Sequence, residues 1–168
     1  MLAVDIDNTI ANTSKSMLHF GMRIDKYPAN VPSGFWSGPK GLKVFMNALP
    51  MAGAVETLQL LTCGEPLLYI TARPAESVFV TKRWLIMHGF PPGKIVFTED
   101  KLDVSKMLGV EMIFEDDPAQ AIKLAKHGIV VGLISQPYNK KVKHKRIIRF
   151  DGWKSVRRKI APGNGVVR

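Results

Sequence analysis

Short apolar runs that do not alternate with polar residues recur along the chain and restrict it to one class of fold. Runs rich in Val, Ile and Leu are typical of strands that are covered on both faces, as in parallel sheets. Segments with helical spacing separate them, so the pattern predicts an α/β sheet with right-handed crossovers and helices on both faces. The predicted strands are residues 2–6, 66–70, 94–97, 112–114, 129–134 and a short one at 147–150. The predicted helices between and after them are residues 54–62, 75–88, 101–108, 118–127 and 153–160.

One interval is longer than a simple crossover requires. About 60 residues separate the first two predicted strands, and long loops in compact domains tend to be functional. Within the interval, residues 13–24 and 42–49 have helical spacing, and a stretch rich in Pro and Gly lies between them. Ligands of open α/β sheets bind beyond the carboxyl ends of strands, so this insertion is placed to cover such a site. We predict a core of residues 1–12 and 51–168 and a small helical cap of residues 13–50; an idle surface loop is the alternative.

Two aspartates, Asp5 and Asp7, stand at the end of the first predicted strand in the run Asp5-Ile6-Asp7-Asn8-Thr9. We expect a turn directly after the strand to bring them together, because Asn8 and Thr9 suit a turn. Two neighbouring carboxylates repel unless a cation or a shared proton lies between them. Magnesium, which prefers oxygen ligands, meets that need. A pair of helix-capping aspartates is the alternative.

A second acidic group, Glu115-Asp116-Asp117, follows another predicted strand. Three consecutive carboxylates repel one another unless a positive charge lies nearby. Adjacent parallel strands end at the same edge, so these acids and the Asp5/Asp7 pair can face one crevice and supply metal ligands from two strands. Asp117 immediately precedes Pro118 and also suits a helix N-cap.

The remaining strand ends offer groups that could bind phosphate. Thr71 follows the second predicted strand, and its hydroxyl, with nearby backbone N–H groups such as that of Ala72, could form a phosphate cradle at a helix start. A cation is needed to offset the charge of a transferring phosphoryl group. Lys101, at the head of the next helix, is our candidate, and Lys106 is its competitor.

The four motifs together resemble the haloacid dehalogenase (HAD) superfamily of phosphohydrolases. The runs DIDNT, ITAR and FEDD and the helix-leading lysine occur in the superfamily's order between residues 2 and about 134. The resemblance implies a HAD-like Rossmannoid sheet with a small helical cap inserted after the first strand. Within the superfamily, the run FEDDPAQAIKLAKHGI and the later SQPYNK resemble the 5′(3′)-deoxyribonucleotidase-like nucleotidase branch.

The resemblance also implies roles for the motif residues. Asp5 would attack phosphorus and become an aspartyl-phosphate, while Asp7 would protonate the leaving oxygen and then activate water. Thr71, Ala72 and Lys101 would bind the phosphoryl group, and Lys101 would also steady the nucleophile. Magnesium would be held by the Asp5 carboxylate, the Asp7 backbone carbonyl and one acid of the second cluster. Asp116 is the preferred ligand and Asp117 the second choice, and the run of three acids leaves that register open.

Composition and charge limit the cellular location and the binding partners that we expect. The chain has a single cysteine, Cys63, no signal-peptide pattern and no apolar run long enough to span a bilayer, from which we expect a cytoplasmic protein without a membrane partner. The net charge of +10 comes from residues 136–168, which hold eleven Lys or Arg and one acid, Asp151. A solvated, partly flexible segment is the favoured interpretation, and a nucleic-acid surface is the alternative. The oligomeric state is left open.

Substrate choice depends on the predicted cap. Its aromatic rings could stack on a base, which would favour a nucleoside monophosphate, or could simply pack the cap onto the core. They are Phe20, Tyr27, Phe35, Trp36 and Phe45. We therefore expect a magnesium-dependent phosphatase of a nucleotide or similar small ester. The alternatives are a phosphatase of nucleic-acid ends and a non-catalytic phosphate-binding protein.

Overall fold

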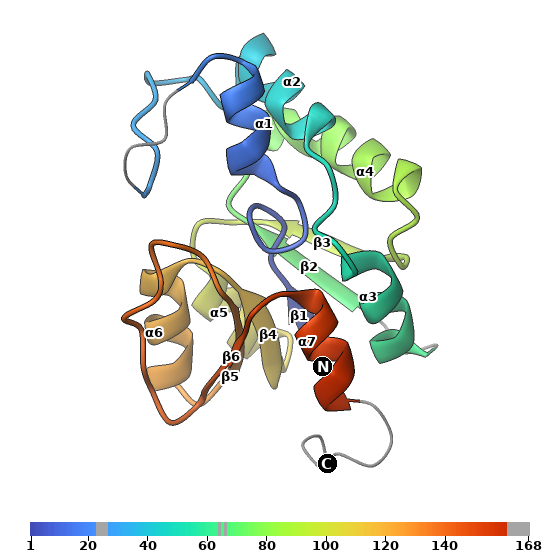
Figure 1. Cartoon of the computed structure of the whole chain (residues 1–168), viewed down its shortest axis with the longest axis vertical. Coiled ribbons are helices and arrows are strands. Elements are labelled where there is room, and N and C mark those ends of the chain that lie inside the picture. The colour runs from blue at the N-terminus through green and yellow to red at the C-terminus, as the bar shows by residue number, and fades with distance from the viewer. Residues whose placement is uncertain (23–26, 64, 66, 161–168) are drawn as a thin grey trace.

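The computed structural model describes residues 1–22, 27–63, 65 and 67–160. Its centre is a six-stranded sheet in the order β3-β2-β1-β4-β5-β6 (Figure 1), in which every neighbouring pair is parallel. The strands are β1 (Leu2–Val4), β2 (Leu67–Thr71), β3 (Gly93–Phe97), β4 (Met112–Glu115), β5 (Val130–Ile134) and β6 (Ile147–Phe150). The predicted parallel α/β sheet is thus confirmed, with β1 next to the centre and its carboxyl end between those of β2 and β4.

Helices cover both faces of the sheet, as the uninterrupted apolar runs require. Alternate residues of each strand point to opposite faces, so Leu67 and Tyr69 join one apolar cluster and Leu68 and Ile70 join the other. The first cluster is completed by α3 (Ala54–Thr62), α4 (Val78–Met87) and α7 (Trp153–Ile160). The second is completed by α5 (Lys101–Met107) and α6 (Pro118–Lys126). Figure 1 shows α5 and α6 on the opposite side of the sheet from α3 and α7.

The interval between β1 and β2 contains α1 (Thr13–His19) and α2 (Pro39–Asn47) as well as α3. The first helix is shorter than predicted, because Phe20 forms its C-cap and Gly21 takes a left-handed φ of 73° that a helix cannot continue through; residues 23–26 lie outside the described part. The second begins earlier than predicted, since Pro39 suits the first helical turn.

The two helices after the first strand pack next to a core helix. The Ser16 hydroxyl of α1 donates to the Val44 carbonyl of α2 at 2.8 Å, and the indole of Trp84 in α4 donates to the Ala48 carbonyl after α2 at 2.6 Å. Figure 1 shows α1, α2 and α4 side by side. The division into a core of residues 1–12 and 51–168 and a cap of residues 13–50 stays a prediction. Within the described residues, none of the helices combines the length and the apolar composition that a bilayer crossing requires.

Candidate active site

A tight turn directly after β1 turns the first acidic motif toward one cavity. The Ile6 carbonyl accepts from the N–H groups of Ile10 at 2.9 Å and Ala11 at 2.8 Å. Asn8 takes a positive φ of 56°, which Asn tolerates better than most residues, and its side-chain oxygen accepts from the Ser14 N–H at 2.8 Å. Asp5 and Asp7 therefore both line the same cavity, as the turn predicted from Asn8 and Thr9 requires.

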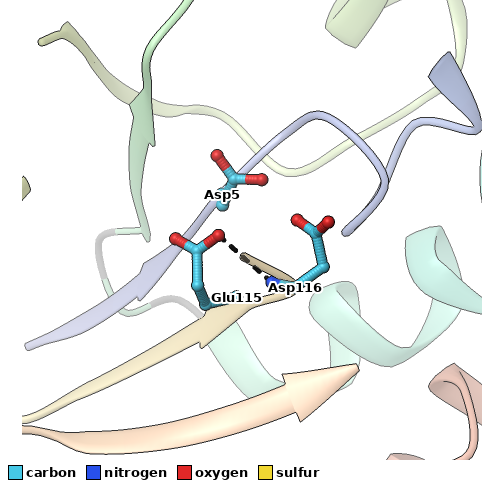
Figure 2. A group of neighbouring side chains, drawn as sticks. All are labelled: Asp5, Glu115 and Asp116. Carbon is cyan, nitrogen blue, oxygen red and sulfur yellow. Dashed lines mark hydrogen bonds between the residues drawn. The ribbon is translucent and has the colours of Figure 1, made fainter. Parts of the chain in front are cut away.

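Three buried carboxylates from two adjacent strand ends form a compact cluster. Asp5 follows β1, Glu115 ends β4, and Asp116 follows it; one oxygen from each lies within 4.8 Å of the others. Figure 2 shows their carboxyl groups converging on one space. Burial, which outweighs the opposing charge of Lys101, raises the pKa of Asp5 to about 7. Burial and the two neighbouring carboxylates also raise the pKa of Asp116 well above its usual value.

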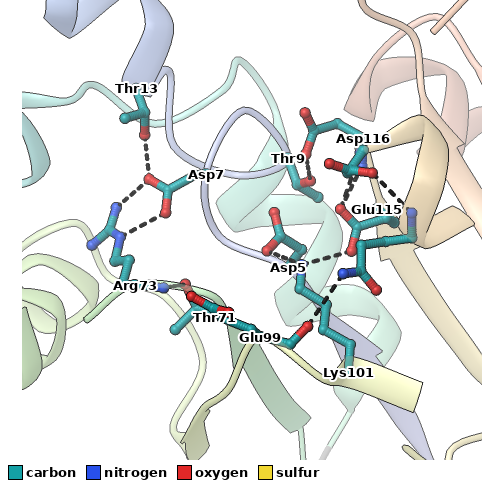
Figure 3. Close-up of polar contacts among 12 residues, drawn as sticks. Asp5, Asp7, Thr9, Thr13, Thr71, Arg73, Glu99, Lys101, Glu115 and Asp116 are labelled. Carbon is teal, nitrogen blue, oxygen red and sulfur yellow. Dashed lines mark hydrogen bonds and ion pairs between the residues drawn. The ribbon is translucent and has the colours of Figure 1, made fainter. Parts of the chain in front are cut away.

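Lys101 supplies the positive charge at this cluster. Its Nζ donates to Asp5 Oδ1 at 2.5 Å and to Glu115 Oε2 at 2.7 Å (Figure 3). It is the first residue of α5, and Asp100 caps that helix by accepting from the Leu102 and Asp103 N–H groups. Although burial opposes it, the two carboxylates raise the pKa of the ammonium, so Lys101 stays charged. The competing Lys106 is exposed, so the structure brings Lys101, not Lys106, to the candidate nucleophile.

The three consecutive acids after β4 have different partners. Glu115 uses one oxygen for Lys101 and the other for the N–H groups of Asp116 and Asp117, both at 3.1 Å. Asp117 caps α6, because its Oδ1 accepts from the N–H groups of Ala119 at 2.7 Å and Gln120 at 2.8 Å. The structure therefore shows Asp117 as a helix N-cap, the alternative to its role as a metal ligand.

Asp116 is held by two hydroxyl groups. Thr9 donates to its Oδ1 at 2.8 Å, and Tyr138 donates to its Oδ2. Its carboxylate stays in the cluster with Asp5, whose second oxygen accepts no hydrogen bond from the described residues. With Glu115 committed to Lys101 and Asp117 to α6, these contacts favour Asp116 as the ligand from the second motif.

The carboxylate of Asp7 is held apart from that cluster by Arg73. The guanidinium donates from Nε to Asp7 Oδ2 and from Nη2 to Asp7 Oδ1, both at 2.8 Å, and Thr13 donates to Oδ1 at 2.5 Å (Figure 3). Burial alone would raise the pKa of Asp7, but the Arg73 charge and its hydrogen bonds lower it below the usual value. The Arg73 side chain is fully buried; it also donates to the Thr81 hydroxyl at 3.1 Å and lies 4.2 Å from the Phe45 ring centroid.

The predicted phosphate cradle lies beside this ion pair. Ala72 lines the cavity. Thr71 is buried at the end of β2, and its hydroxyl accepts from the Arg73 N–H at 3.2 Å. The roles of Thr71 and Ala72 toward a phosphoryl group stay predictions.

The cavity has a volume of about 280 Å³, and its polar floor faces an apolar wall. Of the five aromatic residues predicted for the cap, Tyr27, Trp36 and Phe45 line it. Trp36 and Phe45 stack at 5.1 Å between ring centroids. Phe35 instead packs edge-on against Trp36 at 4.9 Å, and the partly exposed Phe20 is not among the lining residues.

A second aromatic pair joins this wall to the loop after β5. The rings of Tyr27 and Tyr138 stack with centroids 3.8 Å apart and planes 11° apart. The Tyr27 hydroxyl donates to Asp117 Oδ2 at 2.7 Å, and that of Tyr138 donates to Asp116. Burial, together with these carboxylates, raises the pKa of both phenols, so both stay protonated hydrogen-bond donors at neutral pH.

The donor set of the cluster fits a divalent cation. Three carboxylates face one ammonium, which leaves two negative charges when all are ionised. Hard divalent cations are bound by carboxylate oxygens of this kind. The cluster could therefore hold such an ion, with Asp5 and Asp116 as its carboxylate ligands.

Comparison with known proteins places the chain in a family. The model of the family described as "5′ nucleotidase, deoxy (Pyrimidine), cytosolic type C protein" matches residues 36–163, more than half of the chain. The chain belongs to this family. The match to the 5′-nucleotidase model includes Thr71, Lys101 and Asp116 and begins after Asp5 and Asp7.

Individual relatives of this chain are also named as nucleotidases. A protein of Bacillus cereus named "Putative nucleotidase" is 33% identical over 127 residues, which cover 72% of this chain and 66% of the relative. A "Putative nucleotidase" of Bacillus subtilis is 29% identical over 121 residues, which cover 70% of this chain and 63% of the relative. The chain thus spans slightly less than two thirds of the length of these relatives.

Solved structures share the fold at low sequence identity. An L-2-haloacid dehalogenase superposes with a TM-score of 0.64 at 9% identity, covering 95% of this chain and 98% of the other. The resemblance to the haloacid dehalogenase fold predicted from the four motifs is thereby confirmed.

Several site residues were not identified from the sequence. Arg73 was given no role, although its place in the ITAR run beside Thr71 was a signal for one. Glu115 was treated as a possible metal ligand, not as the partner of Lys101. Tyr138 lies in the SQPYNK run, but that run did not indicate its contact with Asp116, which joins chain segments 22 residues apart.

Proposed function

We propose that this protein is a magnesium-dependent phosphomonoester hydrolase that acts through an aspartyl-phosphate on Asp5, with a nucleoside monophosphate or a similar small ester as substrate. The observation that carries the proposal is the environment of Asp5. One carboxylate oxygen is bound by Lys101 at 2.5 Å, and the other accepts no hydrogen bond from the described residues. The carboxylate also belongs to the cluster with Asp116. A carboxylate so placed has one oxygen available for attack and a cation to offset the incoming charge.

The chain's own residues account for both halves of the reaction. In the first, an Asp5 oxygen forms a bond to phosphorus, the bond from phosphorus to the ester oxygen breaks, and that oxygen receives a proton through Asp7, which is ionised in the free protein and so first takes the proton from water. In the second, Asp7 takes a proton from water, whose oxygen attacks the same phosphorus and returns Asp5 as a free carboxylate. Arg73 keeps the Asp7 carboxylate fixed at the cavity wall for these transfers, with two hydrogen bonds of 2.8 Å.

The phosphoryl oxygens would lie between Lys101 and the backbone at Ala72, near the buried end of β2. Asp5, Asp116 and the backbone carbonyl of Asp7 would hold Mg²⁺, which when bound would offset the negative charge of phosphate. The ligand from the second motif is Asp116 in this proposal, because the other two acids are used by Lys101 and by the α6 cap.

The aromatic wall supports a nucleotide as substrate. Trp36, Phe45 and Tyr27 line the cavity together with the carboxylates. A nucleobase has flat faces that stack well on such rings, whereas a sugar phosphate has none. The family name and the names of the two Bacillus relatives agree with this choice.

A substrate screen tests the proposal. Purified protein with Mg²⁺ is assayed for phosphate release from ribo- and deoxyribonucleoside 5′- and 3′-monophosphates, sugar phosphates and p-nitrophenyl phosphate. We expect nucleotides to be the best physiological substrates. Asp5→Asn should lower turnover by roughly 10⁴-fold or more, as loss of a nucleophile does in other hydrolases. The matched control is Asp103→Asn, an exposed acid of α5, which should retain wild-type turnover.

Acid quenching with a radiolabelled substrate tests the intermediate. Label should stay on wild-type protein and be absent from Asp5→Asn. Absence of turnover with every ester would refute the hydrolase and leave the non-catalytic phosphate-binding alternative, whereas turnover that survives in Asp5→Asn would refute the assigned nucleophile.

A further inference from the structure

The net charge of the protein belongs to one segment that follows the candidate active site. Of the 24 Lys and Arg residues, eleven lie at positions 136–168, and of the 14 Asp and Glu residues only Asp151 does. The other 135 residues therefore hold thirteen of each sign and carry no net charge. The strand predicted at 147–150 and the helix predicted at 153–160 are found in this segment as β6 and α7, and its partial flexibility stays a prediction.

Four lysines of this segment occupy the connection between β5 and β6, here called the basic loop (residues 140–146). They are Lys140, Lys141, Lys143 and Lys145, and all four are exposed. Within the described residues, none of them takes part in an ion pair. Exposed cations without acidic partners keep their full charge for a ligand.

The backbone that displays these lysines is fixed from inside. Arg149 of β6 donates to the Asn139 side-chain oxygen at 2.9 Å, to the Asn139 carbonyl at 2.8 Å and to the Val142 carbonyl at 3.1 Å. Asn139 is itself buried and donates to the carbonyls of Asp116 and Ile134, both at 2.8 Å, while Val142 packs against the core. Little conformational entropy would thus be lost when the loop binds a partner.

The basic loop starts at the edge of the candidate active site. Gln136, just before it, donates to the Asn8 carbonyl at 2.8 Å, and Asn8 lines the cavity that contains Asp5. Gln136 also lines a second cavity of about 350 Å³, together with Lys140 and Arg149. The hydrogen bond from Gln136 to Asn8 thus joins a residue that lines the second cavity to one that lines the first, and Lys140 is the lysine of the loop that lines the second cavity.

We propose that the basic loop binds the sugar–phosphate backbone of a single-stranded nucleic acid. A row of lysines on a fixed backbone is complementary to regularly spaced phosphates, and such contacts carry affinity without reading sequence. A membrane surface fits less well. Within the described residues, the exposed large hydrophobic side chains all lie outside positions 136–159, so the loop has no apolar group beside it to insert into a bilayer. This inference goes beyond the proposed function and does not require it.

Binding is measured by fluorescence anisotropy with a labelled single strand of about 12 nucleotides, within the usual site sizes, in EDTA so that hydrolysis plays no part. The test variant is Lys140→Gln/Lys141→Gln/Lys143→Gln/Lys145→Gln. The matched control, Lys82→Gln/Arg83→Gln/Lys94→Gln/Lys106→Gln, removes four exposed charges from α4, α5 and β3, the strand at the opposite edge of the sheet. Thermal unfolding of each variant verifies that it is folded.

The salt dependence decides the outcome. Four single-strand phosphate contacts contribute a slope of about 2.8, so raising salt from about 50 to about 200 mM should weaken wild-type and control binding about 50-fold more than it weakens binding by the loop variant. Absence of wild-type binding, or an equal loss of slope in both variants, would overturn the proposal. So would binding to vesicles of anionic phospholipid without binding to the strand. Because turnover is not measured, none of these results depends on whether the protein is a phosphatase.

Discussion

The ion pair between Asp7 and Arg73 makes a prediction that can be tested before any substrate is known. The Arg73 side chain is fully buried and that of Asp7 is 27% exposed, and the two share two hydrogen bonds of 2.8 Å. If each charge is in the interior because the other compensates it, removal of both should cost less than the sum of the two single removals. Asp7→Asn and Arg73→Gln are therefore compared singly and together.

The structure sets the size of each effect. Asp7→Asn leaves a buried guanidinium with the Thr81 hydroxyl and the Phe45 ring as its remaining partners among the described residues, and an uncompensated buried charge costs about 3–5 kcal/mol. Arg73→Gln leaves a carboxylate that reaches some water and keeps Thr13, so its cost should be near the lower end, about 3 kcal/mol. For a domain of this size that corresponds to a fall in Tm of about 6–12 °C. The double variant should cost about 2 kcal/mol less than the sum of the two single variants.

Urea unfolding at pH 7, followed by far-ultraviolet circular dichroism in EDTA, measures the cycle. At that pH Asp7 is ionised, because pairing with Arg73 lowers its pKa below the ordinary 3.8. Asp103→Asn, an exposed acid, is the control and should change stability by less than about 0.5 kcal/mol. If the changes in the free energy of unfolding of the two single variants add up to that of the double variant within about 0.5 kcal/mol, the reasoning is refuted. Such a result would mean that the two charges do not depend on each other.

Two further predictions concern the carboxylate cluster. Thr9→Val removes the hydroxyl that holds Asp116 at 2.8 Å and should weaken Mg²⁺ binding by about 10–100-fold; an unchanged affinity in isothermal titration calorimetry would contradict this role. Without metal, the folded state raises the pKa of Asp5 to about 7 and also that of Asp116, so it favours their protonated forms. Their contribution to stability is therefore greatest below about pH 4 and declines as pH rises toward about 7. In EDTA the Tm should fall over this range, and Mg²⁺ should reduce the fall; equal pH profiles with and without Mg²⁺ would be inconsistent with a metal site there.

The arrangement of the sheet and the meeting of its strand-end residues were predictable from local sequence. Apolar runs such as that of β2 report burial on both faces, and in a parallel sheet every strand has its carboxyl end at the same edge. Those two rules alone bring Asp5, Thr71 and Asp116 to one rim. Helix bounds were less accurate, because α1 ends where Gly21 turns and the run between α1 and α2 has no periodicity from which to predict structure.

The partners within the site could not be predicted in the same way. Arg73 meets Asp7 across 66 residues of sequence, and Lys101 meets Asp5 across 96. Neither pairing leaves a periodic trace, and that of Lys101 with Asp5 was expected from the family resemblance alone. The choice among Glu115, Asp116 and Asp117 depends on which side chain faces Lys101 when β4 ends, and which one caps α6. Both depend on the orientation of the chain at one turn, and a run of three similar residues does not specify that orientation.

The charged residues of the cavity and the aromatic residues that could select a substrate come from different parts of the chain. The carboxylates and Lys101 come from strand ends and a helix start of the sheet, where a shift of one residue would break several buried charge contacts at once. The apolar wall comes from Tyr27, Trp36 and Phe45, whose contacts are mainly between rings. Aromatic packing tolerates exchange of one ring for another far better than a buried ion pair tolerates loss of a partner. The wall can therefore change with the substrate while the charged floor stays the same, and for that reason the proposed substrate class depends on Tyr27, Trp36 and Phe45 more than on the four motifs.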